Sequence, residues 1–579
     1  MKELMLGNAA VARGLYEAGC RFVSSYPGTP STEITEKAAE YDEIYAEWAS
    51  NEKVALESAV GASLAGARSF TAMKHVGLNV AADPLFTAAY VGVNAGLVVC
   101  VADDPAIHSS QNEQDSRHYA RAAKLPMLEP ADSAECLAFA KRAFDISEQY
   151  DTPVLLRTVT RIAHSQSLVE TSPRVEPPLR PYAKDMQKYV AMPAVAVKRH
   201  VVVEEHMEAL RGLTEKIDLN REEMRDPTVG FVASGAAYQY VREAFPQASV
   251  FKIGMVYPLP VERIRAFAAK VDRLYVIEEL DPFIETALRA AGIALAGGKD
   301  RTGLLGELSQ YRVRKAMGAS LPPTKTLGET LPGRPPVMCA GCPHRGLFTV
   351  LSRMKLTVFG DIGCYTLGAT PPLSALDTTL CMGASFNMLH GYAAIRPEEA
   401  KKSVAVLGDS TFIHSGITGV VNTVYNLGVT TMIVLDNAIT GMTGHQQNPT
   451  TGMTLKNVPA PKIHIEKLCE GAGVPVQNIR VVDPGDMKEL TRVLREELAK
   501  DAPSVVVCRR PCALLKYVKH KPPVRISADK CRGCRACMKL GCPALRFAQG
   551  KVWVDETQCV GCGLCAQTCG FGAIEEGEA

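Results

Sequence analysis

The sequence has no long apolar segment and almost no excess of charge. None of its apolar runs reaches the roughly 18 residues that a membrane-spanning helix needs, and its first residues lack the apolar stretch of a signal peptide. The 579 residues include 64 Lys and Arg against 62 Asp and Glu, a net charge of +2. This balance gives no general attraction to nucleic acid or to a membrane surface. We therefore expect a cytoplasmic protein that binds neither.

Cysteine, in contrast, is abundant and clustered. The chain has 18 cysteines, and in a reducing compartment clustered thiols indicate metal more often than disulfides. Residues 531–569 hold two runs spaced C-x2-C-x2-C, each followed by one further cysteine. In two-cluster ferredoxins the last cysteine of each run binds the cluster of the other run. The spacing predicts two [4Fe–4S] clusters, one on Cys531, Cys534, Cys537 and Cys569, the other on Cys559, Cys562, Cys565 and Cys542.

Two details depart from the usual ferredoxin pattern. Four residues, not three, separate Cys537 from Cys542, and Gly570 follows the last cysteine where proline is usual. Zinc is the alternative metal, because C-x2-C pairs also bind zinc, although tandem cysteine triplets are rare in zinc sites. These cysteines explain only residues 524–579, so most of the chain must have another role.

A second metal site is predicted in the middle of the C-terminal half. Residues 403–407 and 431–435 are apolar strands, and the span between them is long enough for a crossover helix, which makes the strands parallel. Asp409 and Asn437 then follow the carboxyl ends of these strands, where α/β sheets bind ligands. Together with the backbone carbonyl of Ile439, they could supply oxygen ligands to a hard divalent ion.

The N-terminal third offers a carboxylate near the start of a helix. Ile44, Ala46 and Trp48 alternate as in a half-buried strand, and a helix rich in Ala, Gly and Ser follows. Glu52 lies in its first turn and Glu57 five residues further on. Both could simply favour the helix dipole. Upstream, the stretch YPGTPSTE from Tyr26 has the residues of a turn between two prolines, with a capping Ser or Thr.

These stretches together resemble a known family. The GDS at 408–410 and the DN at 436–437 resemble the thiamine diphosphate motif GDG…NN, with Ser410 and Asp436 as departures. With TGMTGHQ at 440–446, the region is similar to the diphosphate domain of thiamine-diphosphate-dependent 2-oxoacid:ferredoxin oxidoreductases. GASLAGAR at 61–68 and the stretches 72–85 and 103–120 resemble the same family, and within it the large (α) subunits that act on arylpyruvates.

The resemblance implies a site and roles for its residues. Glu52 would protonate N1′ of the aminopyrimidine ring, and Thr29 would face the substrate. A 2-oxoacid carboxylate needs a cationic clamp, for which Lys74 and His75 are the first candidates and His108 and Arg117 the alternatives. Thiamine diphosphate and Mg²⁺ would contact Gly408, Asp409, Ser410, Asn437, Ile439 and Thr443.

A third cluster is also implied. In related oxidoreductases a C-x2-C pair, a third cysteine and a distant fourth hold a cluster close to the thiamine. The cysteines at matching places are Cys339, Cys342, Cys364 and Cys512. The alternative is a C-x2-C loop beside buried thiols. The basic stretch 508–525 could dock an acidic ferredoxin or could be a solvated linker.

The predicted fold class is α/β, with two parallel-sheet cofactor domains, a transketolase-C-terminal-like α/β domain and a C-terminal ferredoxin-like α+β domain. The predicted boundaries are 1–165 (pyrimidine domain), 166–226 (linker and connecting segment), 227–325 (transketolase-C-terminal-like), 326–337 (linker), 338–523 (diphosphate domain) and 524–579 (ferredoxin-like).

The implied activity is the coenzyme-A-dependent oxidative decarboxylation of an arylpyruvate such as indole-3-pyruvate, with reduction of ferredoxin. A small β subunit in an α2β2 assembly is implied as partner. Three alternatives stay open: a relative acting on pyruvate or phenylglyoxylate, an electron-transfer subunit with degenerate thiamine domains, and a non-oxidative thiamine lyase.

Overall fold

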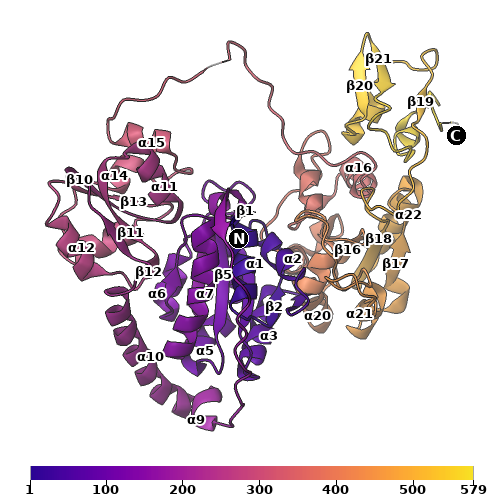
Figure 1. Ribbon diagram of the computed structural model, residues 1–579. Helices are drawn as coiled ribbons and strands as arrows, with labels where there is room; N and C mark the ends of the chain where they lie inside the picture. Colours follow the sequence, from indigo (N-terminus) through magenta and orange to yellow (C-terminus); the bar gives the residue numbers. More distant parts are fainter. Residues whose placement is uncertain (1, 326, 578–579) are drawn as a thin grey trace. The chain divides into compact units, whose positions relative to one another are not determined.

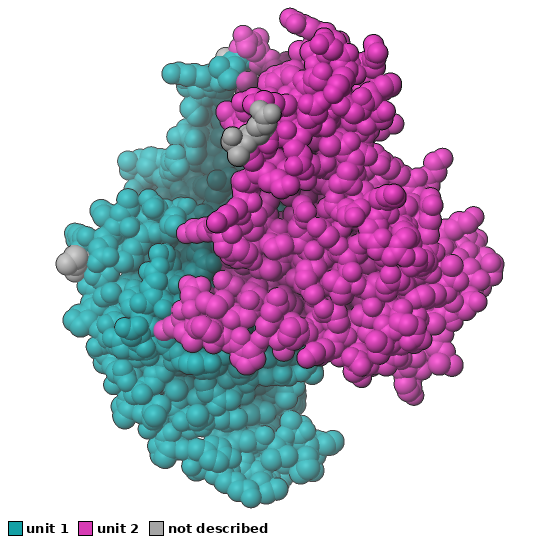
Figure 2. Space-filling model, turned by 90° about the vertical axis from the view of Figure 1, so that its right-hand side faces the viewer, with its two compact units in different colours: residues 1–327 teal, residues 328–579 magenta. Residues whose placement is uncertain are grey.

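The structure is a computed structural model that describes residues 2–325 and 327–577. The chain divides into two compact units, residues 1–327 and 328–579, which are coloured separately in Figure 2. Figure 1 shows the helices and strands of both and labels many of them. No helix among the described residues is long and apolar enough to cross a membrane.

Unit 1 is built on a seven-stranded sheet with the order β12-β6-β7-β5-β4-β2-β3. Its pairs are parallel except for β12 with β6. Strand β5 reads LVVCVAD and is buried throughout, as expected of a parallel strand covered on both faces. The strands are β2 (Phe22–Ser25), β3 (Tyr45–Trp48), β4 (Ser69–Lys74), β5 (Leu97–Asp103), β6 (Met127–Leu128), β7 (Val154–Val159) and β12 (Met255–Tyr257).

The predicted strand before Glu52 is confirmed as β3, with Ile44 and Ala46 buried and Trp48 partly buried. Helices pack on both faces of the sheet. The two that pack most extensively on each other are α1 (Gly7–Glu17) and α7 (Ser133–Tyr150), while α3 (Glu52–Leu64) packs on β2 and β4 and on α5 (Ala82–Val91).

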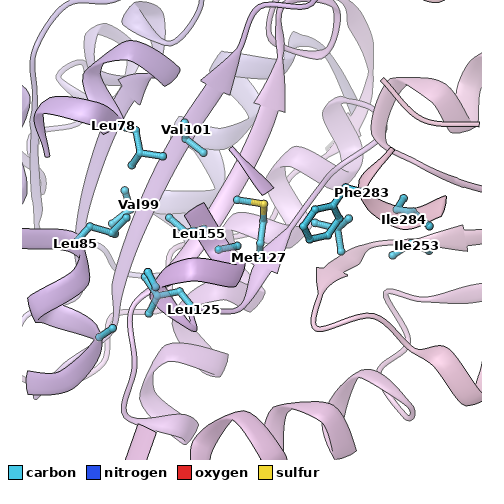
Figure 3. Packing of buried hydrophobic residues seen from close by; sticks show 14 of the residues in the cluster. Leu78, Leu85, Val99, Val101, Leu125, Met127, Leu155, Ile253, Phe283 and Ile284 are labelled. Atoms are coloured by element: carbon cyan, nitrogen blue, oxygen red, sulfur yellow. The ribbon is translucent and has the colours of Figure 1, made fainter. Parts of the chain in front are cut away.

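A second sheet shares the core of the first. It is four-stranded, with the order β13-β10-β11-β9, and β9 is antiparallel to β11. Figure 3 shows Val99 and Met127 of the first sheet in one apolar cluster with Ile253 and with Phe283 of α13 (Phe283–Ala290). The strands are β9 (Arg221–Glu223), β10 (Asp226–Ser234), β11 (Ala248–Ile253) and β13 (Leu274–Ile277), and the helices between them are α11 (Gly235–Ala244) and α12 (Val261–Ala268).

The segment 166–226, expected to be a linker and connecting segment, contains regular structure. β8 (Gln166–Glu170) pairs antiparallel with β1 (Lys2–Leu6). The proline-rich stretch after β8 lies along the first domain, where the backbone N–H of Val175 donates to Glu17 O and that of Arg180 to Gly66 O. The 22-residue helix α10 (Pro193–Thr214) follows.

Unit 2 contains a five-stranded sheet, β14-β15-β16-β18-β17, in which every pair is parallel. The predicted pair of strands is confirmed as β15 (Ser403–Gly408) and β16 (Thr431–Asp436), joined by α20 (Ile417–Tyr425). The other elements are β14 (Thr357–Phe359), β17 (Ile479–Val482), β18 (Ser504–Arg509), α16 (His344–Met354), α17 (Ala384–Ile395), α21 (Ile465–Gly471) and α22 (Met487–Leu498).

The C-terminal part is small and strand-poor. Its two antiparallel pairs are β19 (Arg525–Ile526) with β22 (Ile574–Glu575) and β20 (Leu545–Ala548) with β21 (Lys551–Val554). Leu540 and Leu564 of this part belong to the same apolar cluster as Val482 and Leu490 of the preceding domain. The C-terminal part therefore packs on the five-stranded sheet domain within unit 2.

Candidate active site and cluster sites

Four segments of unit 1 leave the sheet at the same edge. Thr29 follows β2, Glu52 follows β3, Lys74 ends β4 and Asp104 follows β5. These strands are neighbours in the order β5-β4-β2-β3 and run parallel. Because open parallel sheets bind ligands at their carboxyl edge, the residues predicted from the N-terminal third lie where a cofactor site is expected.

Glu52 begins α3, and its side chain is buried. Asn51 is the N-cap, because its side chain accepts a hydrogen bond from the backbone N–H of Val54. Only 5% of Glu52 is exposed. A methyl group placed on Gly77, in α4 (His75–Val80), would lie 2.5 Å from Glu52 Oε1. Gly77 therefore leaves the space that the carboxylate occupies.

Glu57 has a different environment. It is exposed on the same helix and forms an ion pair with Lys53, one turn earlier. An exposed pair of this kind contributes little to stability. Of the two glutamates in the first turns of α3, only Glu52 is buried at the edge of the sheet.

Lys74 and His75 are both buried beside this edge. Lys74 Nζ donates to the carbonyl oxygen of Ser109 at 2.6 Å. Burial lowers the pKa of Lys74, and the nearby charge of Asp104 opposes this. His75 Nε2 lies 3.2 Å from Asn112 O, while its buried Nδ1 has no hydrogen-bond partner among the described residues.

The turn that carries Thr29 lies beside Lys74. Ser31 Oγ donates to the carbonyl oxygen of Gly28 at 2.8 Å, which closes the turn predicted from its two prolines. A Cβ atom on Gly28 would lie 3.2 Å from Lys74 Cβ. Thr29 itself is half-buried, so its side chain is partly accessible beside Lys74.

Arg117 and His108, the alternative carboxylate ligands, already have protein partners. The Arg117 guanidinium is buried, binds the carboxylate of Asp115 and lies 2.7 Å from Glu278 Oε2. His108 Nε2 is exposed and lies 3.2 Å from Glu307 Oε2. Arg117 therefore stabilises the contact between the two sheets of unit 1, and Lys74 is the better candidate for the clamp.

In unit 2, Asp409 follows β15 and Asn437 follows β16, as predicted. Both are buried, and Gly408 pairs with Leu435 at the ends of the two strands. Asp409 Oδ2 accepts a hydrogen bond from Thr450 Oγ1 at 3.0 Å. Burial, and then the charge of Asp436, raise the pKa of Asp409 to about 7. A cation bound here would relieve that cost, which is the electrostatics of a metal ligand.

The structure accounts for the aspartate at position 436, where the related motif has asparagine. Arg509 Nε donates to Asp436 Oδ2 at 2.7 Å, and the same guanidinium binds Glu466 with two hydrogen bonds. Asp436 thus forms an ion pair with a residue of the neighbouring strand β18, and Asn437 beside it is the proposed metal ligand. Sequence reasoning missed Arg509 and Thr450, because no spacing rule links them to the motif.

The other residues proposed for the diphosphate lie around this point. The backbone N–H of Ser410 donates to Asp409 Oδ1 at 2.8 Å, and Ile439 is buried. Thr443 Oγ1 donates to Gln446 Oε1 at 2.6 Å. The carboxylate, amide and carbonyl oxygens available here suit Mg²⁺, which prefers oxygen ligands, so the residues present fit the implied ion and diphosphate.

The eight C-terminal cysteines surround two separate cavities. The four cysteines around each cavity are the four that the spacing predicts for one cluster. In both cases the fourth cysteine comes from the other run. One cavity is lined by Cys531, Cys534, Cys537 and Cys569, which we call the outer set. The other is lined by Cys542, Cys559, Cys562 and Cys565, which we call the inner set.

A third group of cysteines converges in the five-stranded sheet domain. Burial, and then the proximity of Cys512 and Cys339, raise the pKa of Cys364 to about 11. Burial raises the pKa of Cys342 to about 12, with smaller contributions from Cys339 and Cys364. The backbone N–H of Cys512 donates to Asn437 O at 2.9 Å, so this group lies directly beside the candidate metal site.

The third group also adjoins the inner set. Ala340 and Gly341, between Cys339 and Cys342, line the same cavity as Cys559. A Cβ atom on Gly341 would lie 2.3 Å from Val560 Cγ2. Twelve of the 18 cysteines therefore fall into three groups in unit 2, and the groups of Cys339 and Cys559 are in contact.

Comparisons with known proteins define the class. The family model "Pyruvate flavodoxin/ferredoxin oxidoreductase, thiamine diP-bdg" matches residues 13–226. "Thiamine pyrophosphate enzyme, C-terminal TPP binding domain" matches residues 361–508, and "4Fe-4S binding domain" matches residues 552–575. The chain is a catalytic subunit of the thiamine-diphosphate-dependent 2-oxoacid:ferredoxin oxidoreductases, with thiamine diphosphate and iron–sulfur clusters as cofactors.

Full-length relatives narrow the class to one family. The indolepyruvate oxidoreductase subunit IorA of Archaeoglobus fulgidus is 39% identical over 99% of this chain and 97% of its own length. That of Pyrococcus horikoshii is 38% identical over 99% of this chain and 97% of its own. The chain belongs to the family of indolepyruvate oxidoreductase IorA subunits, and acts within a multi-subunit assembly that reduces ferredoxin.

A solved structure is similar at a lower level. A 2-oxoglutarate:ferredoxin oxidoreductase from Magnetococcus marinus matches 55% of this chain and 65% of its own at 19% identity, with a TM-score of 0.46. This likeness is too distant to support residue roles. The family comparisons confirm the α/β fold class with a C-terminal ferredoxin-like domain, the enzyme prediction and the iron–sulfur prediction over zinc.

Proposed function

We propose that this chain catalyses the coenzyme-A-dependent oxidative decarboxylation of arylpyruvates, with indole-3-pyruvate as the first candidate substrate. Each turnover converts one 2-oxoacid and one coenzyme A into an aryl-acetyl-CoA, CO₂, one proton and two electrons. The electrons reduce two ferredoxin molecules, one electron each. The proposal for the substrate rests on the name of the full-length relatives, and the proposal for the site rests on buried Glu52 at the carboxyl edge of its sheet.

Thiamine diphosphate, when bound, supplies the carbanion that attacks the 2-oxo carbon, so no protein nucleophile is needed. Glu52 holds the proton at N1′ of the aminopyrimidine ring, and its burial favours a short hydrogen bond there. Lys74 holds the substrate carboxylate until it leaves as CO₂, with His75 and Thr29 beside it. Asp409, Asn437 and the carbonyl of Ile439 bind Mg²⁺, and Gly408, Ser410 and Thr443 line the diphosphate.

The remaining assignments extend the same proposal. The outer and inner sets hold two [4Fe–4S] clusters, and Cys339, Cys342, Cys364 and Cys512 hold a third. The six segments keep the boundaries given above, with residues 1–165 and 338–523 as the thiamine domains. A separate small β subunit completes an α2β2 enzyme in the cytoplasm.

The test is an anaerobic assay of the chain coexpressed with its small subunit. Viologen reduction is followed with indolepyruvate, phenylpyruvate and pyruvate, each with and without coenzyme A, in the wild type and in Glu52→Gln. Arylpyruvate-driven reduction that needs coenzyme A should fall at least about 10²-fold in Glu52→Gln, since a positioned acid typically contributes this much.

Glu57→Gln is the matched control, because Glu57 is exposed on the same helix, and it should keep near wild-type rates. A preference for pyruvate would support the proposed reaction but show that the proposed substrate is wrong. Intact clusters that no 2-oxoacid reduces would favour the alternative of an electron-transfer subunit, and the proposal would be wrong.

A further inference from the structure

The outer and inner cysteine sets differ in what surrounds them. The inner cavity is lined partly by residues of the preceding domain, namely Ala340, Gly341 and Arg345. Arg345 Nη1 donates to Leu540 O at 2.6 Å and anchors that contact. None of the four inner cysteines is exposed. An inner cluster would therefore lie where two domains of unit 2 meet.

The outer cavity is lined by the C-terminal part alone and includes exposed residues. All of its lining residues come from residues 526–574. Cys534 is exposed, and Phe571, which lines the same cavity, is 53% exposed. Because electron transfer between proteins requires the two redox centres to come close together, the outer set is the one that a second protein could approach.

Charge is segregated in the same domain. Residues 529–551 carry six basic residues and one acidic residue, whereas residues 552–577 carry four acidic residues and none that is basic. The strands β20 and β21, yellow in Figure 1, mark where the two stretches meet. The chain as a whole has a net charge of only +2, so this local excess is not a property of the whole surface.

Three exposed cations lie on the segment 531–540, which carries three of the four outer cysteines. Arg532 and Arg535 line the outer cavity, and Lys539 follows Cys537 by two residues. Arg535 also lies over the ring of Phe547 at 3.8 Å. Arg532 and Lys539 form no ion pair with any described residue, so their charges are available to a partner. We call Arg532, Arg535 and Lys539 the basic rim.

The geometry points to an exit for electrons at the outer set, where the basic rim docks a small acidic iron–sulfur protein. This rests on the proposed function, because it assumes that substrate electrons reach the outer cluster. In each encounter the outer cluster is oxidised by one electron and one carrier is reduced by one electron, so two carriers leave per substrate. Opposite charges at such a contact mainly steer the encounter and weaken with salt.

The test compares binding of an oxidised acidic two-cluster ferredoxin to immobilised holoenzyme by surface plasmon resonance. The variant is Arg532→Glu with Lys539→Glu. The matched control is Lys488→Glu with Arg495→Glu, two exposed cations on α22 of the same unit. We expect Kd to rise at least about tenfold for the rim variant at low salt and by less than about threefold near 0.5 M salt, where the Debye length is only a few Å.

Iron content and electron paramagnetic resonance spectra show whether the clusters remain intact in each variant. A Kd within about twofold of the wild type, or an equal loss in the control, would overturn the docking surface. Viologen reduction separates this result from the proposed function, because a small dye needs no docking surface. If the wild type reduces viologen with an arylpyruvate and the rim variant binds ferredoxin normally, only the docking surface fails.

Discussion

At the scale of single residues, the position of Glu52 depends on the absence of a side chain at Gly77. The carboxylate occupies the volume that a Cβ atom would need, with Oε1 at 2.5 Å and Cγ at 2.7 Å from that point. The helix that begins with Glu52 is capped by Asn51. Gly77 and Glu52 are 25 residues apart in the sequence. The position of the Glu52 carboxylate nevertheless depends on the glycine at position 77.

Gly77→Ala should displace the Glu52 carboxylate and reduce turnover by about 10²-fold or more, because a misplaced catalytic group loses its proton-transfer geometry. The assay is arylpyruvate-dependent viologen reduction. Gly61→Ala is the matched control, since nothing lies within 4 Å of a Cβ atom there and Gly61 is on the helix that begins with Glu52. The control should keep full activity and become slightly more stable. Equal rates in both variants would contradict the prediction.

The sequence predicts some residues of the site and not others for a physical reason. Asp409 and Asn437 could be placed because strand ends carry them and the motif fixes their separation. Arg509, which binds Asp436, is 73 residues away from it, and a contact over that separation depends on the order of strands in the sheet. The hydrogen bond from Arg117 to Glu278, 161 residues later in the chain, could not be predicted for the same reason.

At the scale of elements, the carboxyl end of β13 holds two other elements in place. Glu278 accepts hydrogen bonds from the backbone N–H groups of Ile284 and Glu285 in the first turn of α13. Glu279 accepts from the backbone N–H of Leu308 at 3.0 Å. Both carboxylates are buried. Polar caps of this kind fix where the following segments begin, at the cost of burying charge.

Glu279 should make stability depend on pH. Burial raises its pKa from 4.5 to about 7, so the folded protein keeps a proton that the unfolded chain has released. Its contribution to stability is therefore complete below about pH 4.5 and is lost as the pH rises through about 7. In the wild type this loss should lower the free energy of unfolding by up to about 3 kcal/mol, and Glu279→Gln should abolish it. Urea unfolding across this pH range makes the measurement.

The control for that experiment is Glu262→Gln, at a glutamate whose side chain is 70% exposed. It should leave the pH dependence of the urea midpoint unchanged. The same slope in wild type and Glu279→Gln would show that Glu279 does not keep its proton. The sequence could predict an α/β domain over residues 227–325 but not these caps, because a cap is defined by the element that it meets.

At the scale of the whole molecule, the three cysteine groups predict the iron content. Fully loaded chains should contain about twelve iron atoms if each group holds a [4Fe–4S] cluster. Cys512→Ser should lose iron from the group beside Asn437 and lower the total toward about eight, while the signals of the outer and inner clusters remain. Iron analysis and electron paramagnetic resonance of anaerobically purified protein make the measurement.

Cys381→Ser is the matched control, because Cys381 is exposed and lies outside the three groups, and it should keep the full iron content. A wild type with about eight iron atoms would contradict the third cluster. The sequence could group the eight C-terminal cysteines through their short spacing. It could not show whether Cys512, 148 residues after Cys364, meets the others, because that depends on β18 lying beside β16.

The exchange of the fourth cysteine ties the two ends of the ferredoxin-like domain together. Each run of three cysteines is completed by a cysteine from the other run, so neither half of the domain contains a full set of ligands. With the ligands proposed above, we expect the two clusters to assemble cooperatively, because each needs a cysteine from both runs. Loss of Cys569 should therefore affect the outer set although this residue belongs to the run that supplies the inner set.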